Sequence, residues 1–390
     1  MNYLASFLHG GFFYVGVFLV VLTILVFVHE LGHYLVARWN RVRVEVFSIG
    51  FGTELKGWTD RAGTRWKICA IPLGGYVKMF GESESVVDER TKEPRAMSPE
   101  ETDVSFHHKS LLQRAAIVFA GPFVNYLFAV VAFAILFMVA GVPQTDPNEP
   151  LPPIVGSVAS GSPAEQAGLK IGDRILSVEG EPLALFSDLQ RIVRARPSTS
   201  LRLTIEREGQ ELRLSAVPAA RETTDSSGAK VVHGQLGITA DPGKVEYVRQ
   251  SPARSVWLGV ERTYIVTERI LGYIRDVIVG KQSAEEVGGI LRIAQMSGQV
   301  AELGIANYIT FLAVLSINLG LINLFPVPLL DGGHLAFYAV EAIRGRPLGP
   351  RAQEYGFRIG LALVIALFLF ATWNDLVHLK FFEFIANLFT

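Results

Sequence analysis

The chain has 390 residues, of which 50% are hydrophobic and only 19% charged, whereas soluble domains carry about 25% charged residues. With 36 basic and 37 acidic side chains the net charge is −1, so we expect no nucleic-acid partner. A single cysteine excludes an internal disulfide and a thiolate-based zinc cluster, and the composition as a whole indicates a membrane protein.

The first apolar segment covers residues 1–28 without a charged side chain. A spanning helix needs about 20 mainly apolar residues, and we place the first span at 11–37. A cleavable signal peptide fits poorly, because no basic segment precedes the apolar run and no small-residue cleavage site follows it.

This span ends in His29-Glu30-Leu31-Gly32-His33, an HExxH motif. Residues i and i+4 share one face of a helix, so both imidazoles could bind one metal ion while Glu30 accepts a proton from water. Counted from Gly11, the motif begins after roughly 27 Å of helix, just inside the inner boundary of the membrane, where ionisable groups are costly and usually functional. A polar interfacial anchor is the alternative interpretation.

The segment Ile68–Phe80 alternates apolar strands about Pro72-Leu73-Gly74-Gly75. It predicts a β-hairpin associated with the membrane, with its turn at these four residues. An exposed strand edge there, including Gly74, Gly75 and Tyr76, could hold an unwound substrate by strand addition. An ordinary amphipathic hairpin explains the pattern equally well.

A second span is expected at 114–141 and completes an N-terminal membrane half, residues 1–145. Five prolines in 142–155 form a semi-rigid linker. The run GSVASGSPAEQAGLKIGDRILSVEG at 156–180 then resembles the bacterial type of PDZ domain, and we assign residues 146–242 to one α/β PDZ domain. Such domains receive a peptide, often a C-terminus, as an added strand; a spacer that binds nothing is the alternative.

Residues 243–305 are read as a helical linker, and 306–390 as a C-terminal membrane half whose first span is 306–328. Asn323 lies beside Pro326 and Pro328 in this span. Irregular backbone at membrane depth is tolerated only inside protein or beside a water-filled cavity. Asn323 could donate a hydrogen bond to a developing oxyanion or hold substrate, or it could simply join two helices.

A catalytic zinc ion has three protein ligands and an open position, and we take Asp331 of Leu330-Asp331-Gly332-Gly333 as the third ligand. The alternation of spans brings it to the same side of the membrane as the HExxH motif. His334 is the alternative ligand, and Asp331 could instead cap its own helix. Glu45, the nearest carboxylate downstream of the motif, is less convincing.

A fourth span is expected at 357–374, followed by an interfacial tail at 376–390. Ten Lys and Arg lie in the windows 38–56, 100–114 and 341–358, against two in 1–10, 142–157, 290–305 and 375–390. The positive-inside rule then places both termini and the PDZ domain outside, and the motifs near the cytoplasmic face. The predicted fold is a polytopic α-helical membrane protein with four transmembrane helices.

Four segments together resemble the site-2 protease family of intramembrane zinc metalloproteases, and specifically its bacterial RseP type: HELGHY at 29–34, PLGGYVKM at 72–79, FAGPFVN at 119–125 and SINLGLINLFPVPLLDGGHL at 316–335. The resemblance implies zinc bound by His29, His33 and Asp331, Glu30 as general base, and a substrate-binding Asn323. It implies a re-entrant hairpin at PLGGYVKM. It also implies cleavage of single-span proteins such as anti-sigma factors, and of signal-peptide remnants, at a bacterial inner membrane.

The chain departs from that family in two places. Only one PDZ signature is present where two are frequent, and Gly288-Gly289 replaces a usual Gly-Pro pair. Two other classes of function remain open from the residues alone. A PDZ-bearing membrane adaptor would need no zinc, and a transporter would need paired charges deep in several spans.

Overall fold

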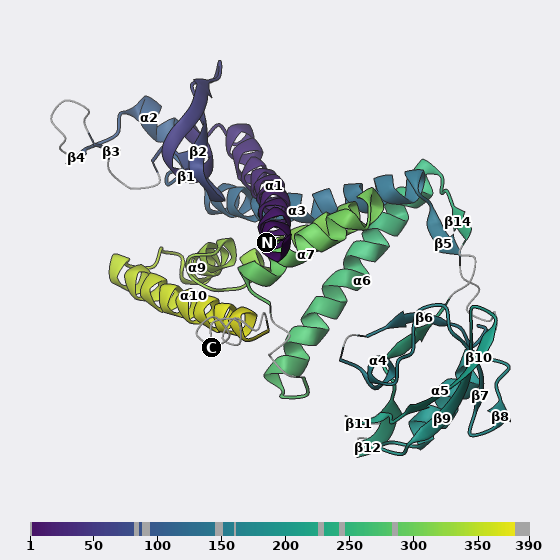
Figure 1. The fold of residues 1–390 in the computed structure, drawn as a ribbon. Helices are drawn as coiled ribbons and strands as arrows, with labels where there is room; N and C mark the ends of the chain where they lie inside the picture. The colour runs from purple at the N-terminus through teal and green to yellow at the C-terminus, as the bar shows by residue number, and fades with distance from the viewer. Residues whose placement is uncertain are drawn as a thin grey trace. The chain divides into compact units, whose positions relative to one another are not determined.

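The computed structural model describes residues 2–81, 86–87, 94–144, 151–159, 161–224, 230–241, 246–282 and 288–378 (Figure 1). The chain divides into two compact units. One consists of Met1–Ala140 and Arg249–Thr390, and the other is Gly141–Val248. The predicted PDZ domain at 146–242 lies within the second unit, and the predicted tail lies outside the described residues from 379 onward.

Within the described residues, four helices of the first unit are long and apolar enough to cross a membrane, as predicted. They are α1 (Asn2–Trp39), α3 (Leu111–Val139), α8 (Ile305–Leu324) and α10 (Pro350–His378). The helix α8 stops at Leu324, short of the predicted end at 328, because Phe325 turns to extended backbone ahead of the two prolines. The fourth helix begins at Pro350 rather than 357.

The other described helices of this unit are α2 (Pro99–Val104), α6 (Pro252–Ile278), α7 (Ile290–Glu302) and α9 (Asp331–Arg344). The start of α7 is fixed by α10, because the buried Asp375 carboxylate accepts backbone N–H groups from Gly289, Leu291 and Arg292. These bonds satisfy donors that every helix N-terminus leaves without intrahelical partners. The N–H of Gly289 is one of them, and a proline at this position could not supply it.

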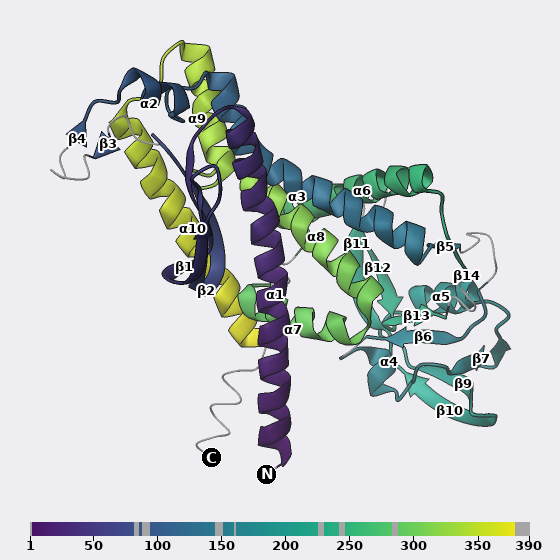
Figure 2. The same ribbon diagram turned by 90° about the horizontal axis from the view of Figure 1, so that it is seen from above.

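The strands β1 (Val44–Thr59) and β2 (Arg65–Met79) lie beside α1 (Figure 2), and β3 (Val86–Val87) pairs with β4 (Pro94–Arg95). The predicted hairpin turn at Pro72–Gly75 is wrong, because β2 runs through these residues. The turn lies at 60–64, where the Asp60 carboxylate accepts the N–H groups of Ala62 and Thr64. The glycine pair serves close packing instead of a turn.

Residues 46–49 of β1 are paired on both sides, with 65–68 and with 75–78 of β2. Gly75, Tyr76 and Val77 therefore have β1 as their only strand partner among the described residues. The segment Gly74–Val77, called the GGYV edge below, therefore lies at the edge of the sheet opposite residues 65–68.

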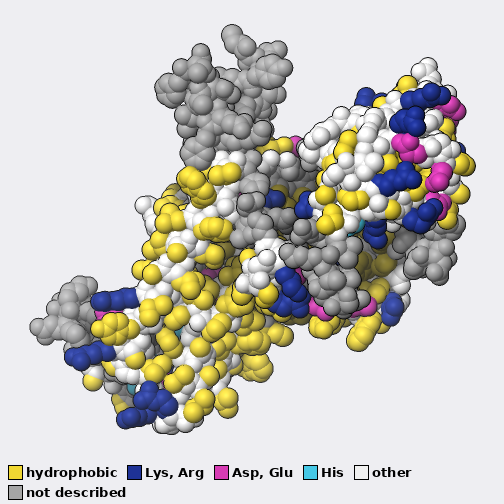
Figure 3. Space-filling view, turned by 90° about the horizontal axis from the view of Figure 1, so that it is seen from below, with side chains coloured by type: hydrophobic (Ala, Val, Ile, Leu, Met, Phe, Trp, Pro, Cys, Tyr) yellow, Lys and Arg dark blue, Asp and Glu magenta, His cyan; other side chains and the backbone are white. Residues whose placement is uncertain are grey.

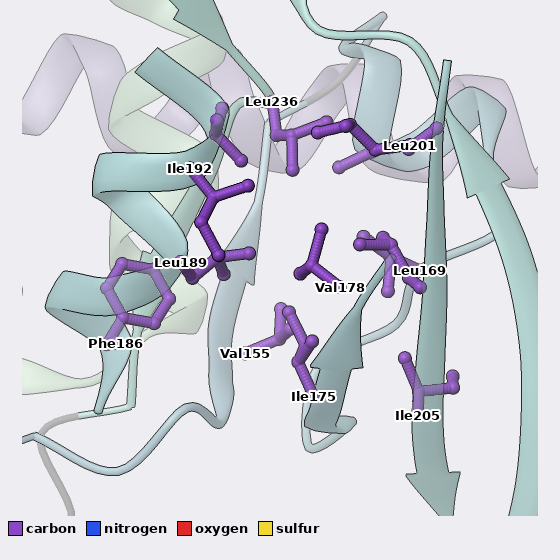
Figure 4. Close-up of a cluster of buried hydrophobic side chains, with 14 residues drawn as sticks. Val155, Leu169, Ile175, Val178, Phe186, Leu189, Ile192, Leu201, Ile205 and Leu236 are labelled. Atoms are coloured by element: carbon purple, nitrogen blue, oxygen red, sulfur yellow. The ribbon is translucent and has the colours of Figure 1, made fainter. Parts of the chain in front are cut away.

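The second unit is a β-rich domain with helices α4 (Pro163–Gln166) and α5 (Phe186–Ala195). One sheet of this domain has the order β10-β9-β7-β8. The pairs β13-β6, β11-β12 and β14-β5 form separate two-stranded sheets. Its core lies between α5 and the strands and includes Val178, Leu189 and Ile205 (Figure 4). The strands are β5 (Val142–Gln144), β6 (Val155–Val158), β7 (Arg174–Val178), β8 (Glu181–Pro182), β9 (Leu201–Arg207), β10 (Gln210–Ala216), β11 (Ala219–Thr224), β12 (Lys230–Gln235), β13 (Ile238–Ala240) and β14 (Glu246–Val248).

Hydrophobic side chains cover much of the face shown in Figure 3. In α10 the side chains of Leu367, Phe368 and Leu369 are each more than half exposed. A soluble protein rarely leaves so large an apolar surface uncovered, and a helix apolar all round is typical of a membrane span.

Candidate metal centre

The helix α1 continues without interruption through the HExxH motif, so His29 and His33 lie one turn apart on the same face. Both are buried, with 9% and 8% of their surface exposed. Their Nε2 atoms are 3.3 Å apart. The structure thus brings together the two imidazoles that were predicted to bind one metal ion.

Asp331 reaches the same point from the other half of the unit. Its Oδ2 atom lies 3.2 Å from His29 Nε2 and 3.5 Å from His33 Nε2. This oxygen atom is buried and has no hydrogen-bond partner within the described chain. Asp331 is the first residue of α9, and Leu330 occupies the cap position, so the alternative role of Asp331 as the helix cap is wrong.

These three atoms match the spacing of a metal site. Zinc binds nitrogen and carboxylate oxygen at about 2.0–2.2 Å in a tetrahedron, which puts neighbouring ligand atoms about 3.4 Å from one another. The three observed separations are 3.2, 3.3 and 3.5 Å. His29, His33 and Asp331 are also the group of described side chains whose ligand atoms could converge on one ion.

The approach of Asp331 depends on irregular backbone between α8 and α9. Leu329 has a φ of 103°, a conformation that residues with a Cβ rarely adopt. A side chain on Gly332 would collide with the carbonyl groups of Leu324 and Phe325. The Asp-Gly-Gly sequence therefore lets the start of α9 pack directly onto the end of α8.

The helix α3 lies against the histidines and contributes residues that sequence reasoning left without a role. A Cβ on Gly121 would lie within 3.0 Å of both imidazoles, and a Cβ on Gly32 would collide with the Ala120 carbonyl. His33 Nδ1 donates a hydrogen bond to the Ile117 carbonyl at 2.9 Å. The signal in the sequence was a Gly-Pro pair and an asparagine inside an apolar span, which the resemblance alone did not explain.

A cavity of about 1110 Å³ opens beside the cluster. Its lining includes all the predicted site residues: His29, Glu30, His33, Gly74, Gly75, Tyr76, Asn323, Asp331 and the alternative ligand His334. Asn323 Nδ2 lies 3.3 Å from His29 Nε2. His334 packs its ring against Phe357 and stands outside the ligand group, while Glu45 pairs with Lys78 on the sheet.

The sheet edge reaches this cavity because glycines let it approach α1. A Cβ on Gly75 would lie 2.7 Å from a Val26 methyl group and 3.2 Å from Glu30 Cγ. Gly74 has a φ of 130°, which also favours glycine. Tyr76 stacks on Phe51 with an angle of 12° between the rings. The GGYV edge and the general-base candidate Glu30 are therefore direct neighbours.

A model of peptidase family M50 matches residues 17–367. Relatives include the Rhizobium meliloti (strain 1021) protein named "Putative zinc metalloprotease", 48% identical over 361 residues, which are 92% of this chain and 95% of that protein. The metalloprotease MmpA of Caulobacter vibrioides is 36% identical over 394 residues, with 95% of this chain and 97% of the relative covered.

Among solved structures, the PDZ domain of an SdrC-like protein from Listeria monocytogenes matches 22% of this chain and 84% of its own, at 18% identity. Its TM-score is 0.18. The assignment of the second unit as a PDZ domain therefore stays a prediction from its sequence signature.

Replacing Gly121 by alanine should weaken metal binding on the order of tenfold or more, because the added Cβ displaces both imidazoles. Metal content and chelator competition of the purified protein measure this. The matched control is Gly16→Ala in α1, whose added Cβ meets nothing within 4 Å. Equal affinity in the two variants would contradict the close contact of α3 with the histidines.

Proposed function

This chain belongs to peptidase family M50, the site-2 protease family of zinc metalloproteases, and we propose that it cleaves membrane-spanning segments of single-span proteins. The observation that carries the proposal is the His29–His33–Asp331 cluster, formed within the apolar helix α1 and at the start of α9, beside a large cavity. Membership of a family of metalloproteases argues against the adaptor and the transporter.

We assign His29, His33 and Asp331 as the zinc ligands. Two neutral imidazoles and a carboxylate suit zinc, and their spacing fits a tetrahedral site. When bound there, zinc supplies Lewis acidity that polarises a peptide carbonyl and makes water more acidic. The three side chains leave the cavity side open, where water and substrate can enter.

Glu30 follows His29 directly on α1 and lines the same cavity. We assign it as the general base that takes a proton from the attacking water and passes it to the leaving amine. Asn323 places its amide beside the His29 ligand atom. From that position it could donate a hydrogen bond to the oxygen of the substrate carbonyl as negative charge develops.

The GGYV edge of β2 is proposed as the substrate-binding strand. A helical substrate hides its peptide bonds in its own hydrogen bonds, so it must unwind before attack. An unpaired backbone donor or acceptor costs several kcal/mol in the membrane. Pairing with Gly75–Val77 would replace the lost hydrogen bonds next to Glu30.

For the whole protein we propose the bacterial inner membrane, with both termini and the second unit on the periplasmic side. The excess of Lys and Arg on the other side supports this orientation. In the second unit, β13 has β6 as its only strand partner among the described residues, so a peptide could extend that sheet. Resemblance to the RseP type suggests anti-sigma-factor and signal-peptide substrates in regulated intramembrane proteolysis.

Glu30→Gln should retain zinc but lower cleavage of a co-expressed single-span substrate by roughly 10²–10⁴-fold, because the base is lost. Asp331→Asn should lose zinc as well as activity. Zinc content and cleavage products are the two measurements. Glu45→Gln is the matched control, since Glu45 pairs with Lys78 away from the cluster. Wild-type cleavage by either site variant would refute the assignment.

The strand proposal predicts a defined crosslinking pattern. In the Glu30→Gln background, a photo-crosslinking amino acid at position 76 should capture a single-span substrate, because Tyr76 lies at the cavity edge. The same group at position 58 should not, because Trp58 pairs with Trp66 and is absent from the cavity lining. Equal capture at both positions would reject the strand as the substrate-binding element.

Deleting residues 150–240 tests the second unit as a gate. The β5–β14 pair outside the deletion can hold the cut ends together. We expect cleavage of substrates with intact periplasmic domains to rise, while substrates already trimmed outside are cut at the wild-type rate. Unchanged selectivity would discard the gate.

A further inference from the structure

Asn125 is a polar residue of the mainly apolar helix α3, and none of its surface is exposed. Burying an unpaired amide in an apolar environment costs several kcal/mol. One end of its side chain is close to the metal centre, with Nδ2 3.1 Å from His29 Nδ1. The other end, Oδ1, has no hydrogen-bond partner in the described chain.

The proton positions of His29 conflict with this orientation of the amide. His29 directs Nε2 toward His33 and Asp331. A neutral imidazole that offers Nε2 to a metal carries its proton on Nδ1. Two donors, Nδ1–H and the Asn125 NH₂ group, would then face each other.

Exchanging the oxygen and nitrogen of the Asn125 amide removes the conflict. The two orientations have nearly the same shape, and the hydrogen-bond network decides between them. With Oδ1 turned to His29, the oxygen accepts the Nδ1–H proton. The NH₂ group then takes the position that Oδ1 had, and Nε2 keeps its lone pair for the metal.

His33 also donates a hydrogen bond from Nδ1–H to an acceptor on α3, which in this case is a backbone carbonyl. Its Nδ1–H donates to the Ile117 carbonyl, also on α3, and its Nε2 points to the cluster. The helix α3 thus offers one acceptor to each histidine, a backbone carbonyl for His33 and a side-chain amide for His29.

We infer that Asn125 is a positioning residue. It fixes the tautomer and ring orientation of His29 by accepting a hydrogen bond from the Nδ1–H group. This inference rests on the proposed zinc site. Helix packing alone does not require the amide, because the link from Ser316 on α8 uses the Asn125 backbone carbonyl, at 2.9 Å.

Zinc affinity of the full-length protein in detergent, measured by competition with a chelator, tests the inference without relying on activity. Loss of such a partner typically weakens metal binding 10–100-fold, and we expect this for Asn125→Leu. Asn125→Asp should bind zinc with an affinity within a few-fold of wild type, since a carboxylate also accepts a hydrogen bond from Nδ1–H. Ser316→Ala, which removes only the helix link, should bind zinc like wild type.

His29→Ala separates this inference from the proposed site. If His29→Ala loses zinc while Asn125→Leu binds like wild type, the positioning role is wrong and the site stands. If His29→Ala also keeps wild-type affinity, the proposed site itself fails. Failure of Asn125→Asp to restore affinity would likewise overturn the acceptor role.

A measurement on the unmutated protein covers the case in which Asn125→Leu does not fold. In ¹⁵N-histidine NMR of the zinc-loaded protein, we expect His29 to be protonated at Nδ1 and metal-bound at Nε2. Metal binding through Nδ1, or a deprotonated Nδ1, would overturn the inference.

Discussion

The candidate metal centre depends on how closely the helices α1 and α3 approach. Gly32 on α1 sits against the Ala120 carbonyl, and Gly121 on α3 sits against the two imidazoles. In lipid, helices gain little from burying apolar surface against each other, so close contact between small residues drives their packing. Here that contact also positions the histidines, because α3 brings the Ile117 carbonyl and Asn125 within reach of their Nδ1 atoms.

A second close contact, between α8 and α9, places the Asp331 carboxylate beside the histidines. The helix α8 stops before the prolines, and the freed carbonyl groups of Leu324 and Phe325 lie against Gly332. The Pro328 carbonyl lies in turn against Gly360 of α10. Larger residues at these glycines would push α9 away and carry Asp331 with it. The irregular segment therefore packs against α9 and α10 and lines the cavity, a setting in which non-helical backbone persists at membrane depth.

The sequence was sufficient to predict the four spans and the two histidines of the cluster, because apolar length and HExxH spacing are local signals. Asp331 was predicted from the alternation of spans, which brings it to the same side of the membrane. It placed the hairpin turn wrongly, since Gly74 and Gly75 have the composition of a turn but serve contact with α1. The role of Asn125 could not be inferred from spacing. It became visible only when two helices distant in sequence were placed side by side and one amide oxygen lacked a donor.

The GGYV edge and the cluster have to lie together for a physical reason. A substrate helix that unwinds in the membrane exposes peptide groups whose desolvation is costly until they are paired again. If pairing and hydrolysis took place at separate depths, the unwound segment between them would carry that cost. Gly75 places the strand edge against Glu30, which follows His29 directly on α1. In the proposed mechanism, the absence of a side chain at Gly75 would therefore link substrate unwinding to the chemistry.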